Sequence, residues 1–225
     1  MGKKTWLSWS SGKDSAWALH VMRQSGEFEV SGLFTTINAT FERVAMHAVR
    51  VELLRQQAAA VGLPLYLIEI PYPCSDEQYA AAMSDFVACA LNEGVQCMAF
   101  GDLYLEDVRR YREERMQGTG IELVFPLWGK PTRPLLQEML SGGLRACLTC
   151  VDPSVLPAEF AGQELTLELL QRMPDDIDPC GEKGEFHTFV FDGPMFNTPL
   201  DIEMGEVVTR DGFVFADCGL KKTRK

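Results

Sequence analysis

Two short polar segments of this chain combine residue types that could carry out chemistry, and the first lies close to the N-terminus. Residues 10–15 read Ser-Ser-Gly-Lys-Asp-Ser, between a strand-like apolar run at 6–9 and a helix-like segment at 16–22. A turn of small residues between a strand and a helix directs backbone N–H groups to one place, at the positive end of the helix dipole. Such a turn suits a phosphate group. Lys13 adds a positive charge, and three hydroxyl donors come from Ser10, Ser11 and Ser15.

This segment differs from the two common glycine motifs for nucleotides. A Walker A loop ends in Gly-Lys-Ser/Thr, whereas Gly12-Lys13 is followed here by Asp14, and Leu7 stands at the position of the first glycine. The chain also lacks a Gly-x-Gly-x-x-Gly dinucleotide fingerprint. Taken alone, the segment could be an ordinary strand-to-helix turn with Asp14 or Ser15 as the N-cap.

The second polar segment, residues 180–188, reads Cys-Gly-Glu-Lys-Gly-Glu-Phe-His-Thr and leads into a strand-like run. Glu182 and Glu185 could accept protons or hold Mg²⁺, and His187 could act as an acid or base near neutral pH. Thr188 could donate a hydrogen bond. A polar turn followed by a strand is the alternative interpretation, but this density of functional groups makes the segment a candidate site.

An alternation of strands and helices must position these residues. The expected strands are 6–9, 29–36, 65–70, 97–100 and 121–125, and the expected helices are 16–22, 45–61, 75–93, 106–116 and one that begins near Pro134. Apolar strands alternating with helices predict an α/β fold with a Rossmann-like parallel sheet and helices on both faces. Ligands bind such sheets at the carboxyl ends of the strands, so we expect residues 10–15, Thr35-Thr36 and Gly101-Asp102 to converge.

The last third of the chain has a different character, because prolines interrupt it and the alternation ends. Residues 185–192 alternate with period two, as a half-buried strand does, and 206–210 and 213–216 flank the hairpin turn Asp211-Gly212. We therefore predict a larger domain over 1–145 and a smaller mixed α+β domain over 146–225 that closes over the active site.

Composition excludes several classes of protein. The formal charge is −11, from 21 Lys and Arg against 32 Asp and Glu, which argues against nucleic acid as a general partner. No apolar run approaches the roughly 20 residues of a membrane span. The start of the chain leads into an expected strand and not a cleavable signal, so we expect no membrane and a cytoplasmic location. A homodimer is a possible assembly, since dimers are the commonest oligomers.

The seven cysteines are expected to be reduced thiols. Cys147 and Cys150 have a spacing that occurs in metal sites, and the further candidate ligands are Cys180, His187 and Cys218. However, residues three apart on a strand point to opposite faces, so a shared zinc or iron–sulfur site would require a turn there.

The two polar segments together carry a family resemblance. Residues 10–15 resemble the Ser-Gly-Gly-x-Asp-Ser pyrophosphate loop (PP-loop) of the N-type ATP pyrophosphatases, with Ser11 where Gly is usual. With Gly-Glu-x-Gly-Glu-Phe-His-Thr at 181–188, the chain resembles the diphthine–ammonia ligase family. Three more segments fit that family: Met46-His47-x-x-Arg50-x-Glu52-Leu53-Leu54, Gly62-Leu63-Pro64-Leu65 and Phe100-Gly101-Asp102-Leu103-Tyr104-Leu105-Glu106-Asp107.

The resemblance implies an adenine nucleotide alpha hydrolase-like fold and a ligase that uses ATP and Mg²⁺. Members activate a carboxylate with ATP, release pyrophosphate, and let ammonia displace AMP to form an amide. The implied partners are therefore ATP, ammonia and a carboxylate acceptor whose identity the sequence leaves open.

Roles for single residues follow from the resemblance. Ser10, Ser11, Gly12 and Ser15 would hold the β- and γ-phosphates, and Lys13 would neutralise charge on the departing pyrophosphate. Asp14 would coordinate Mg²⁺ or only cap the helix. Further along, Thr35 and Thr36 would offer backbone groups to adenine, and Gly101 and Asp102 would meet the ribose or Mg²⁺, with a helix cap as the alternative for Asp102. Glu182, Glu185 and His187 would orient ammonia or the acceptor.

Two other functions remain open at this stage. The first is a PP-loop pyrophosphatase that modifies tRNA or a small metabolite, which the acidic charge disfavours and the cysteines keep in play. The second is a sensor that binds an adenine nucleotide without turnover.

Overall fold

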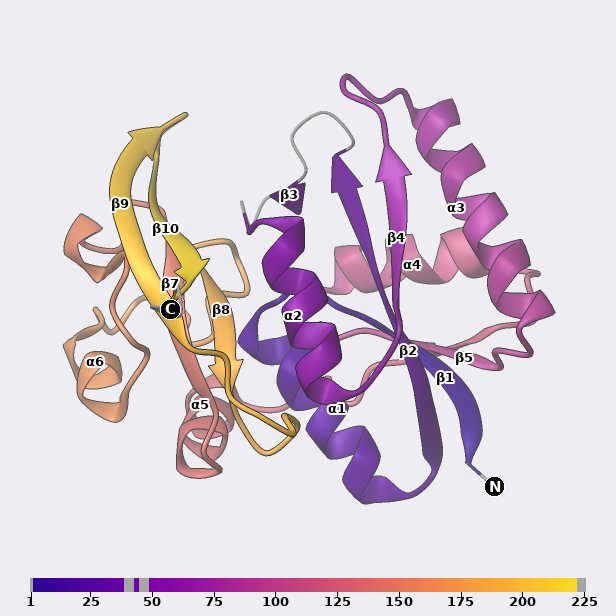
Figure 1. The fold of residues 1–225 in the computed structure, drawn as a ribbon, viewed down its shortest axis with the longest axis horizontal. Helices are drawn as coiled ribbons and strands as arrows, with labels where there is room; N and C mark the ends of the chain where they lie inside the picture. The colour runs from indigo at the N-terminus through magenta and orange to yellow at the C-terminus, as the bar shows by residue number, and fades with distance from the viewer. Residues whose placement is uncertain (1, 39–42, 45–48, 222–225) are drawn as a thin grey trace.

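The computed structural model describes residues 2–38, 43–44 and 49–221. Its first part alternates strands and helices as the sequence predicts (Figure 1). The elements in order are β1 (Lys3–Ser8), α1 (Lys13–Ser25), β2 (Phe28–Asn38), β3 (Arg43–Val44), α2 (Val51–Val61), β4 (Leu65–Ile70), α3 (Asp76–Asn92), β5 (Cys97–Ala99), α4 (Glu106–Met116), β6 (Glu122–Val124) and α5 (Thr132–Ser141).

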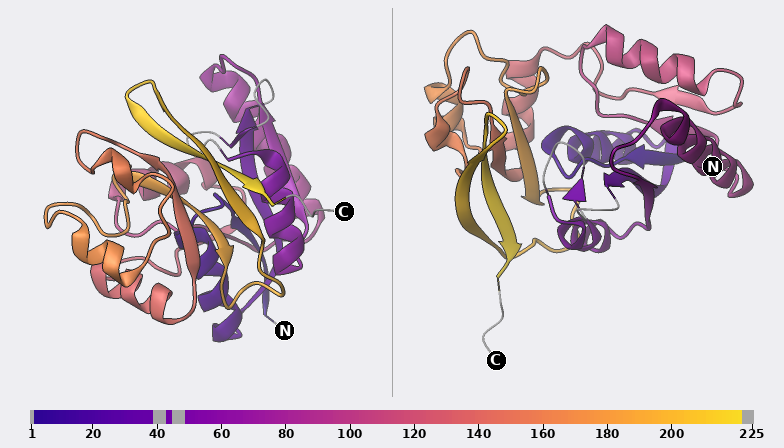
Figure 2. Two further views of the ribbon diagram at one scale, coloured as in Figure 1. Left: turned by 60° about the vertical axis from the view of Figure 1, so that its left-hand side comes forward. Right: turned by 90° about the horizontal axis from the view of Figure 1, so that it is seen from above.

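The first sheet is parallel over five strands, in the order β4-β2-β1-β5-β6, and the short β3 pairs antiparallel with the end of β2. Helices α1 and α2 cover one face, and α3 and α4 cover the other (Figures 1 and 2). The strand order reverses between β1 and β5, and this reversal is the place where open α/β sheets bind ligands. The predicted Rossmann-like fold is confirmed.

Local signals set the helix limits, with one correction. Ser75 and Gln78 form the predicted capping box at the start of α3. The residue Gly62, at φ +73°, ends α2 in the left-handed conformation that glycine tolerates. Helix α2 begins at Val51 and not at residue 45, because Arg50 is its extended N-cap; residues 45–48 lie outside the described residues.

The second sheet is antiparallel, in the order β8-β7-β10-β9. It consists of β7 (Arg145–Val151), β8 (Phe186–Asp192), β9 (Ile202–Arg210) and β10 (Phe213–Leu220), with a 3₁₀ turn η1 (Ala158–Phe160) and helix α6 (Leu167–Arg172) in the β7–β8 connection. The hairpin turn is confirmed: Asp211 and Gly212 both have positive φ, at +51° and +85°. The mixed α+β character of this part is therefore as predicted.

Strand β8 departs from the half-buried strand that its alternation predicts. Phe186, Thr188, Phe189 and Val190 are all buried, on both faces of the strand. The reason is the position of the strand: helices α1 and α2 lie between the two sheets and cover β8 from the side of the first sheet (Figures 1 and 2). Buried side chains of α1 and α2 join those of β7 and β8 in one continuous hydrophobic cluster.

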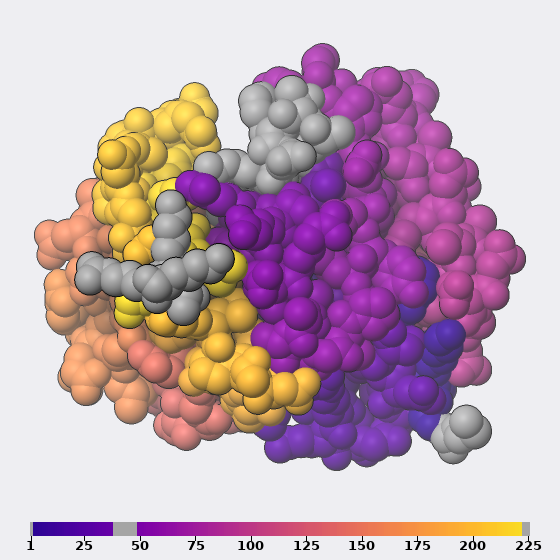
Figure 3. Space-filling model, in the orientation of Figure 1, coloured from indigo at the N-terminus to yellow at the C-terminus, as the bar shows by residue number. Residues whose placement is uncertain are grey.

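The space between the two parts stays open on one side. In the space-filling view the surface is hollowed between the β9–β10 hairpin and the N-terminal part (Figure 3). A cavity of about 410 Å³ lies between the start of α2 and this hairpin, and an ion pair between Arg50 and Asp217 links the two sides. Within the described part of the chain, no helix is long and apolar enough to cross a bilayer.

The shared cluster predicts that both sheets unfold together. Phe189 is fully buried in β8, and we expect Phe189→Ala to lower the free energy of unfolding by about 3–5 kcal/mol. All four tryptophans lie in the first part, at positions 6, 9, 17 and 128, so their fluorescence reports on that part alone. In urea titrations, the fluorescence midpoint should fall together with the far-UV circular dichroism midpoint. An unchanged fluorescence midpoint would show that the two parts unfold separately.

Candidate active site

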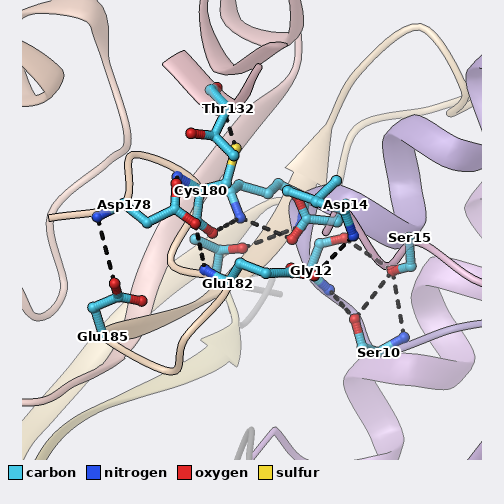
Figure 4. A network of polar contacts seen from close by, with 12 residues as sticks. Ser10, Gly12, Asp14, Ser15, Thr132, Asp178, Cys180, Glu182 and Glu185 are labelled. Carbon is cyan, nitrogen blue, oxygen red and sulfur yellow. Dashed lines mark hydrogen bonds and ion pairs between the residues drawn. The ribbon is translucent and has the colours of Figure 1, made fainter. Parts of the chain in front are cut away.

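The phosphate-loop candidate occupies the turn between β1 and the first residues of α1. Gly12 is the N-cap of α1 but has no side chain to cap it. The Ser15 hydroxyl donates to the Gly12 carbonyl (3.0 Å) and lies 3.2 Å from the Ser10 hydroxyl (Figure 4). These hydroxyls therefore brace the turn from within, and the first residues of α1 line the cavity described below.

A buried amide holds the other side of this turn. Gln57 of α2 is fully buried, and its Nε2 donates to the carbonyls of Ser11 (3.0 Å) and Val190 (2.6 Å). Its Oε1 accepts a hydrogen bond from the indole N–H of Trp9 (2.8 Å). The backbone N–H of Val190 also donates to the Ser11 carbonyl (3.0 Å). The turn is thus fixed by α2 and by β8 of the second sheet.

The backbone conformation of Ser11 explains why glycine is usual at this position. Its φ is +72°, which costs a residue with a Cβ roughly 1–2 kcal/mol relative to the right-handed region. Its hydroxyl is buried and has no hydrogen-bond partner among the described residues. The hydrogen bonds to its carbonyl hold the residue in this conformation, so serine retains the loop shape at some cost in stability.

Strand β8 also supplies the missing cap of α1. The Thr188 hydroxyl accepts a hydrogen bond from the backbone N–H of Lys13 (3.1 Å). A Cβ on Gly12 would lie only 3.3 Å from the carbonyl oxygen and the hydroxyl of Thr188, so the close approach favours glycine there. The Thr188 hydroxyl accepts in this contact, and its own O–H hydrogen can still donate as predicted.

Lys13 is a buried cation in the centre of the site. Its ammonium donates to Asp14 Oδ2 (2.8 Å) and to the carbonyl of Cys180. It also lies 5.5 Å from the centre of the Phe186 ring. Burial opposes the charge, but the carboxylate of Asp14 and other nearby negative groups raise the pKa of Lys13 above its ordinary value. The residue therefore stays protonated at neutral pH.

Asp14 can accept a cation as well as hold Lys13. Its second oxygen, Oδ1, is buried and has no hydrogen-bond partner within the described residues. Burial raises the pKa of Asp14, although Lys13 opposes this. No three His, Cys, Asp or Glu side chains in the described ranges are grouped to hold a metal ion by themselves. A Mg²⁺ ion that is bound mainly through phosphates needs only one or two carboxylates, so Asp14 fits that ion.

The loop before β8 is organised by Asp178, which the sequence analysis missed. Its carboxylate accepts hydrogen bonds from the backbone N–H groups of Cys180 (3.2 Å) and Glu182 (3.0 Å) and from the hydroxyl of Tyr104 (3.1 Å). These contacts direct the Cys180 carbonyl to Lys13 and the Glu182 carboxylate to the backbone N–H of Leu103 (2.7 Å; Figure 4).

The predicted acid–base residues of this loop differ in pKa and in whether they line the cavity. Burial raises the pKa of Glu182 to about 7, with the Leu103 N–H opposing and the negative charge of Asp14 adding to the shift. Burial and the nearby Lys13 lower the pKa of His187 to about 4, so His187 is neutral near pH 7 and poorly suited to donate a proton. Glu185 does not line the cavity, because its carboxylate accepts hydrogen bonds from the Lys183 and Asp178 N–H groups (3.0 and 3.4 Å).

Asp102 neither caps a helix nor points free into the site. Its carboxylate binds Arg112 of α4 with two hydrogen bonds, 2.6 Å from Nε and 3.0 Å from Nη2, and the N-cap of α4 is Leu105. The Arg112 guanidinium also lies 4.3 Å from the centre of the Phe100 ring. Gly101 packs against the start of α1, where an added Cβ would lie 2.9 Å from backbone atoms of Asp14 and Ser15.

Two adjoining cavities collect these residues at the carboxyl edge of the first sheet. A polar cavity of about 210 Å³ is lined by the loop after β1, by Gly101 and Asp102, and by Glu182, His187 and Thr188. An apolar cavity of about 440 Å³ beside it is lined by Thr35 and Thr36 and by side chains of α3 and α4. The residues that line both cavities are Ser8, Ser10, Phe100 and Arg112. The predicted convergence of distant segments is confirmed.

The end of β2 offers a peptide group to the apolar cavity. The Phe34 carbonyl accepts a hydrogen bond from the N–H of Trp9 on the β1 side of the strand. Alternate residues of a strand direct their backbone N–H and C=O groups to the same side, so those of Thr36 also point to the β1 side. The last residue pair between β1 and β2 is Ser8 with Phe34, so Thr36 lies beyond the end of this pairing. This supports the predicted use of backbone groups there.

The Cys147 thiol interacts with that of Cys218, but in the described part of the chain Cys147, Cys150 and Cys180 belong to no group of three potential metal ligands. Cys147 and Cys150 are buried in β7, and register places Cys150 opposite His187 and Cys147 opposite Phe189. The Cys180 thiol donates to the Thr132 carbonyl (3.4 Å), and burial raises the pKa of this thiol. All three are free thiols.

Comparisons with known proteins agree with the fold and with the family that the sequence resembles. A diphthamide synthase N-terminal domain model matches residues 3–122, and a diphthamide synthase C-terminal domain model matches residues 132–222. The chain is 31% identical to the diphthine–ammonia ligase of Danio rerio over 190 residues, which cover 75% of this chain and 72% of that relative.

Two other relatives bear the same name. The diphthine–ammonia ligase of Homo sapiens is 25% identical over 194 residues, or 78% of this chain and 70% of the relative. That of Bos taurus is 31% identical over 132 residues, which span 55% of this chain and about half (48%) of the relative. The N-terminal model alone spans more than half of the chain. The chain therefore belongs to the diphthamide synthase family, and it is an enzyme of the ligase class.

Proposed function

We propose that this protein is an AMP-forming amide ligase of the diphthine–ammonia ligase type, which adenylates a carboxylate that ammonia then attacks. The observation that carries the proposal is the pair of adjoining cavities at the reversal of strand order. The polar cavity contains the N-terminus of α1 and a buried cation, and the apolar one has the size and lining for a nucleoside. A nucleoside triphosphate requires both environments in this order.

In the proposed complex, adenosine occupies the apolar cavity and the peptide group of Thr36 hydrogen-bonds to adenine. The β- and γ-phosphates lie at the N-terminus of α1, beside Ser10 and Ser15. Lys13 stabilises the charge that develops on the departing pyrophosphate, because its ammonium is fixed beside the phosphate position before the reaction begins.

Asp14 is the residue that would hold Mg²⁺, through the oxygen that Lys13 does not use. A bound Mg²⁺ would add positive charge at the phosphate oxygens.

In the second step of the proposed reaction, ammonia must attack as NH₃, with its lone pair free of a proton. Glu182 lines the polar cavity and has a pKa of about 7, so a large fraction is ionised at neutral pH. We assign it as the base that takes a proton from ammonia as nitrogen attacks the acyl carbon and AMP leaves. Neutral His187 would hydrogen-bond the acceptor, and Glu185 would keep the loop in shape without contacting substrate.

The relatives' name makes diphthine the first acceptor to test, with ATP, Mg²⁺ and ammonium. Product analysis should find AMP and pyrophosphate in equal amounts and ¹⁵N from labelled ammonium in the amide. Release of ADP and phosphate would contradict the proposal. Tight ATP binding with no turnover for diphthine or a panel of other carboxylates would instead favour the nucleotide sensor, and dependence on added RNA would favour a tRNA-modifying enzyme.

Replacement of the buried cation should remove turnover but not the fold. We expect Lys13→Met to lower kcat/KM for ATP by about 10²–10³-fold, because the charge on the leaving pyrophosphate loses its fixed partner. The matched control is Lys183→Met, which changes an exposed lysine in the loop before β8. Equal rates for the two variants, with unchanged thermal midpoints, would show that Lys13 does not face the phosphates.

The protonation of Glu182 should appear in the pH profile. After correction for ionisation of ammonium itself, kcat/KM for ammonia should rise with pH through an inflection near 7, because only the ionised carboxylate accepts a proton. Glu182→Gln should abolish this inflection, whereas Glu114→Gln, an exposed change on α4, should retain it. An inflection that persists in Glu182→Gln would assign the base elsewhere.

A further inference from the structure

The position of the reacting atom can be read from the two cavities, if the proposed function holds. With adenosine in the apolar cavity and the outer phosphates in the polar one, the α-phosphate must lie where the cavities join. That phosphorus is the atom which the acceptor carboxylate attacks. The residues that line both cavities, Ser8, Ser10, Phe100 and Arg112, therefore surround it.

Arg112 is the cation of this shared set. Lys13 lines only the polar cavity and is already bound to Asp14 and Cys180, and Arg115 lines only the apolar cavity. An attack on the α-phosphorus places negative charge on its non-bridging oxygens, and a fixed donor at this point lowers the energy of the transition state.

The guanidinium of Arg112 is held in place on two sides. Asp102 binds its Nε and one Nη2 hydrogen, and the ring of Phe100 lies beneath it at 4.3 Å. A guanidinium has five N–H donors in a rigid plane, and this pairing uses two of them. The other N–H groups remain for a ligand, so Arg112 can bind Asp102 and a phosphate oxygen at the same time without reorientation.

We propose that Arg112 is a catalytic residue, which donates to a non-bridging oxygen of the α-phosphate of ATP, and that Asp102 is its positioning residue. As a carboxylate oxygen of the acceptor bonds to the α-phosphorus, the bond from that phosphorus to the oxygen bridging to the β-phosphate breaks. The electron pair leaves with pyrophosphate, and Arg112 stabilises the oxygens that stay on phosphorus. This role for Asp102 replaces direct contact with ribose or Mg²⁺.

Helix α4 brings Arg112 to the site although most of its charged side chains are exposed. Helix α4 carries exposed charges such as Glu113 and Arg110, which read as a solvated face. Arg112 is only partly exposed: the exposed fraction of its side chain is 31%, against 16% for Asp102. The helix therefore places Arg112 beside Asp102, which follows the end of β5.

The test compares Arg112→Met with Arg110→Met, an exposed cation on the same helix. We expect Arg112→Met to lower kcat for pyrophosphate release by about 10²-fold or more while the Kd for ATP changes much less, because the contact strengthens in the transition state. Arg110→Met should match the parent protein. Asp102→Asn should reduce kcat by a smaller factor, since the arginine loses its orientation and not its charge.

Sulfur substitution locates the contact. The two diastereomers of ATP with sulfur on the α-phosphorus should differ in rate with the parent protein, and this ratio should shift toward one in Arg112→Met under the same Mg²⁺ concentration. The double variant Asp102→Asn/Arg112→Met leaves no unpaired buried carboxylate, so it guards against loss of folding and should remain slow. If Arg112→Met keeps a third or more of the parent kcat and an unchanged diastereomer ratio, the inference is wrong. If the parent itself releases no pyrophosphate, the proposed function fails instead.

Discussion

The hydrogen bonds that join the turn after β1 to strand β8 determine the geometry of the whole site. The Ser11 carbonyl accepts from Gln57 and from the Val190 N–H, and the Lys13 N–H donates to Thr188. Each such bond contributes on the order of 1 kcal/mol, and more when its loss leaves a buried group unpaired. The turn is therefore not a feature of the first sheet alone: its conformation, including the left-handed Ser11, exists because the second sheet is docked on α1 and α2.

Two ion pairs place positive charge in the site of an acidic protein. The chain has a net charge of −11, yet two cations, Lys13 and Arg112, line its polar cavity. Each cation is paired with one carboxylate, Asp14 or Asp102, which holds it in place. A local site for an anion is thus compatible with a surface that repels polyanions.

The loop before β8 contains polar side chains that hold its shape and others that line the cavity. Asp178 and Glu185 spend their carboxylates on backbone N–H groups of the loop itself, so they set its shape. Glu182 projects to the cavity with a pKa near 7, and His187 stays neutral. Four polar residues that look equivalent in the sequence therefore have different properties, because burial and neighbouring charges differ from one position to the next.

The amino-acid sequence by itself determined the alternation of elements, the parallel sheet, the hairpin at Asp211-Gly212, and the segments that meet at the carboxyl edge. These features depend on periodicity, capping and turn residues, which act over a few positions along the chain. The start of α2 was predicted too early because apolar spacing continues before the extended Arg50 that begins the helix.

Only the tertiary structure decided which polar side chains face the cavity and with what protonation. Gln57, Asp178 and Arg112 belong to no recognisable motif. Arg112 binds Asp102, which lies 10 positions away in the sequence, and Gln57 binds Val190, which lies 133 positions away. Glu185 turned away from the cavity, and β8 became buried on both faces, for the same reason. Long-range packing of the second sheet against α1 and α2 chose the exposed side of each residue, and neither spacing nor composition encodes that choice locally.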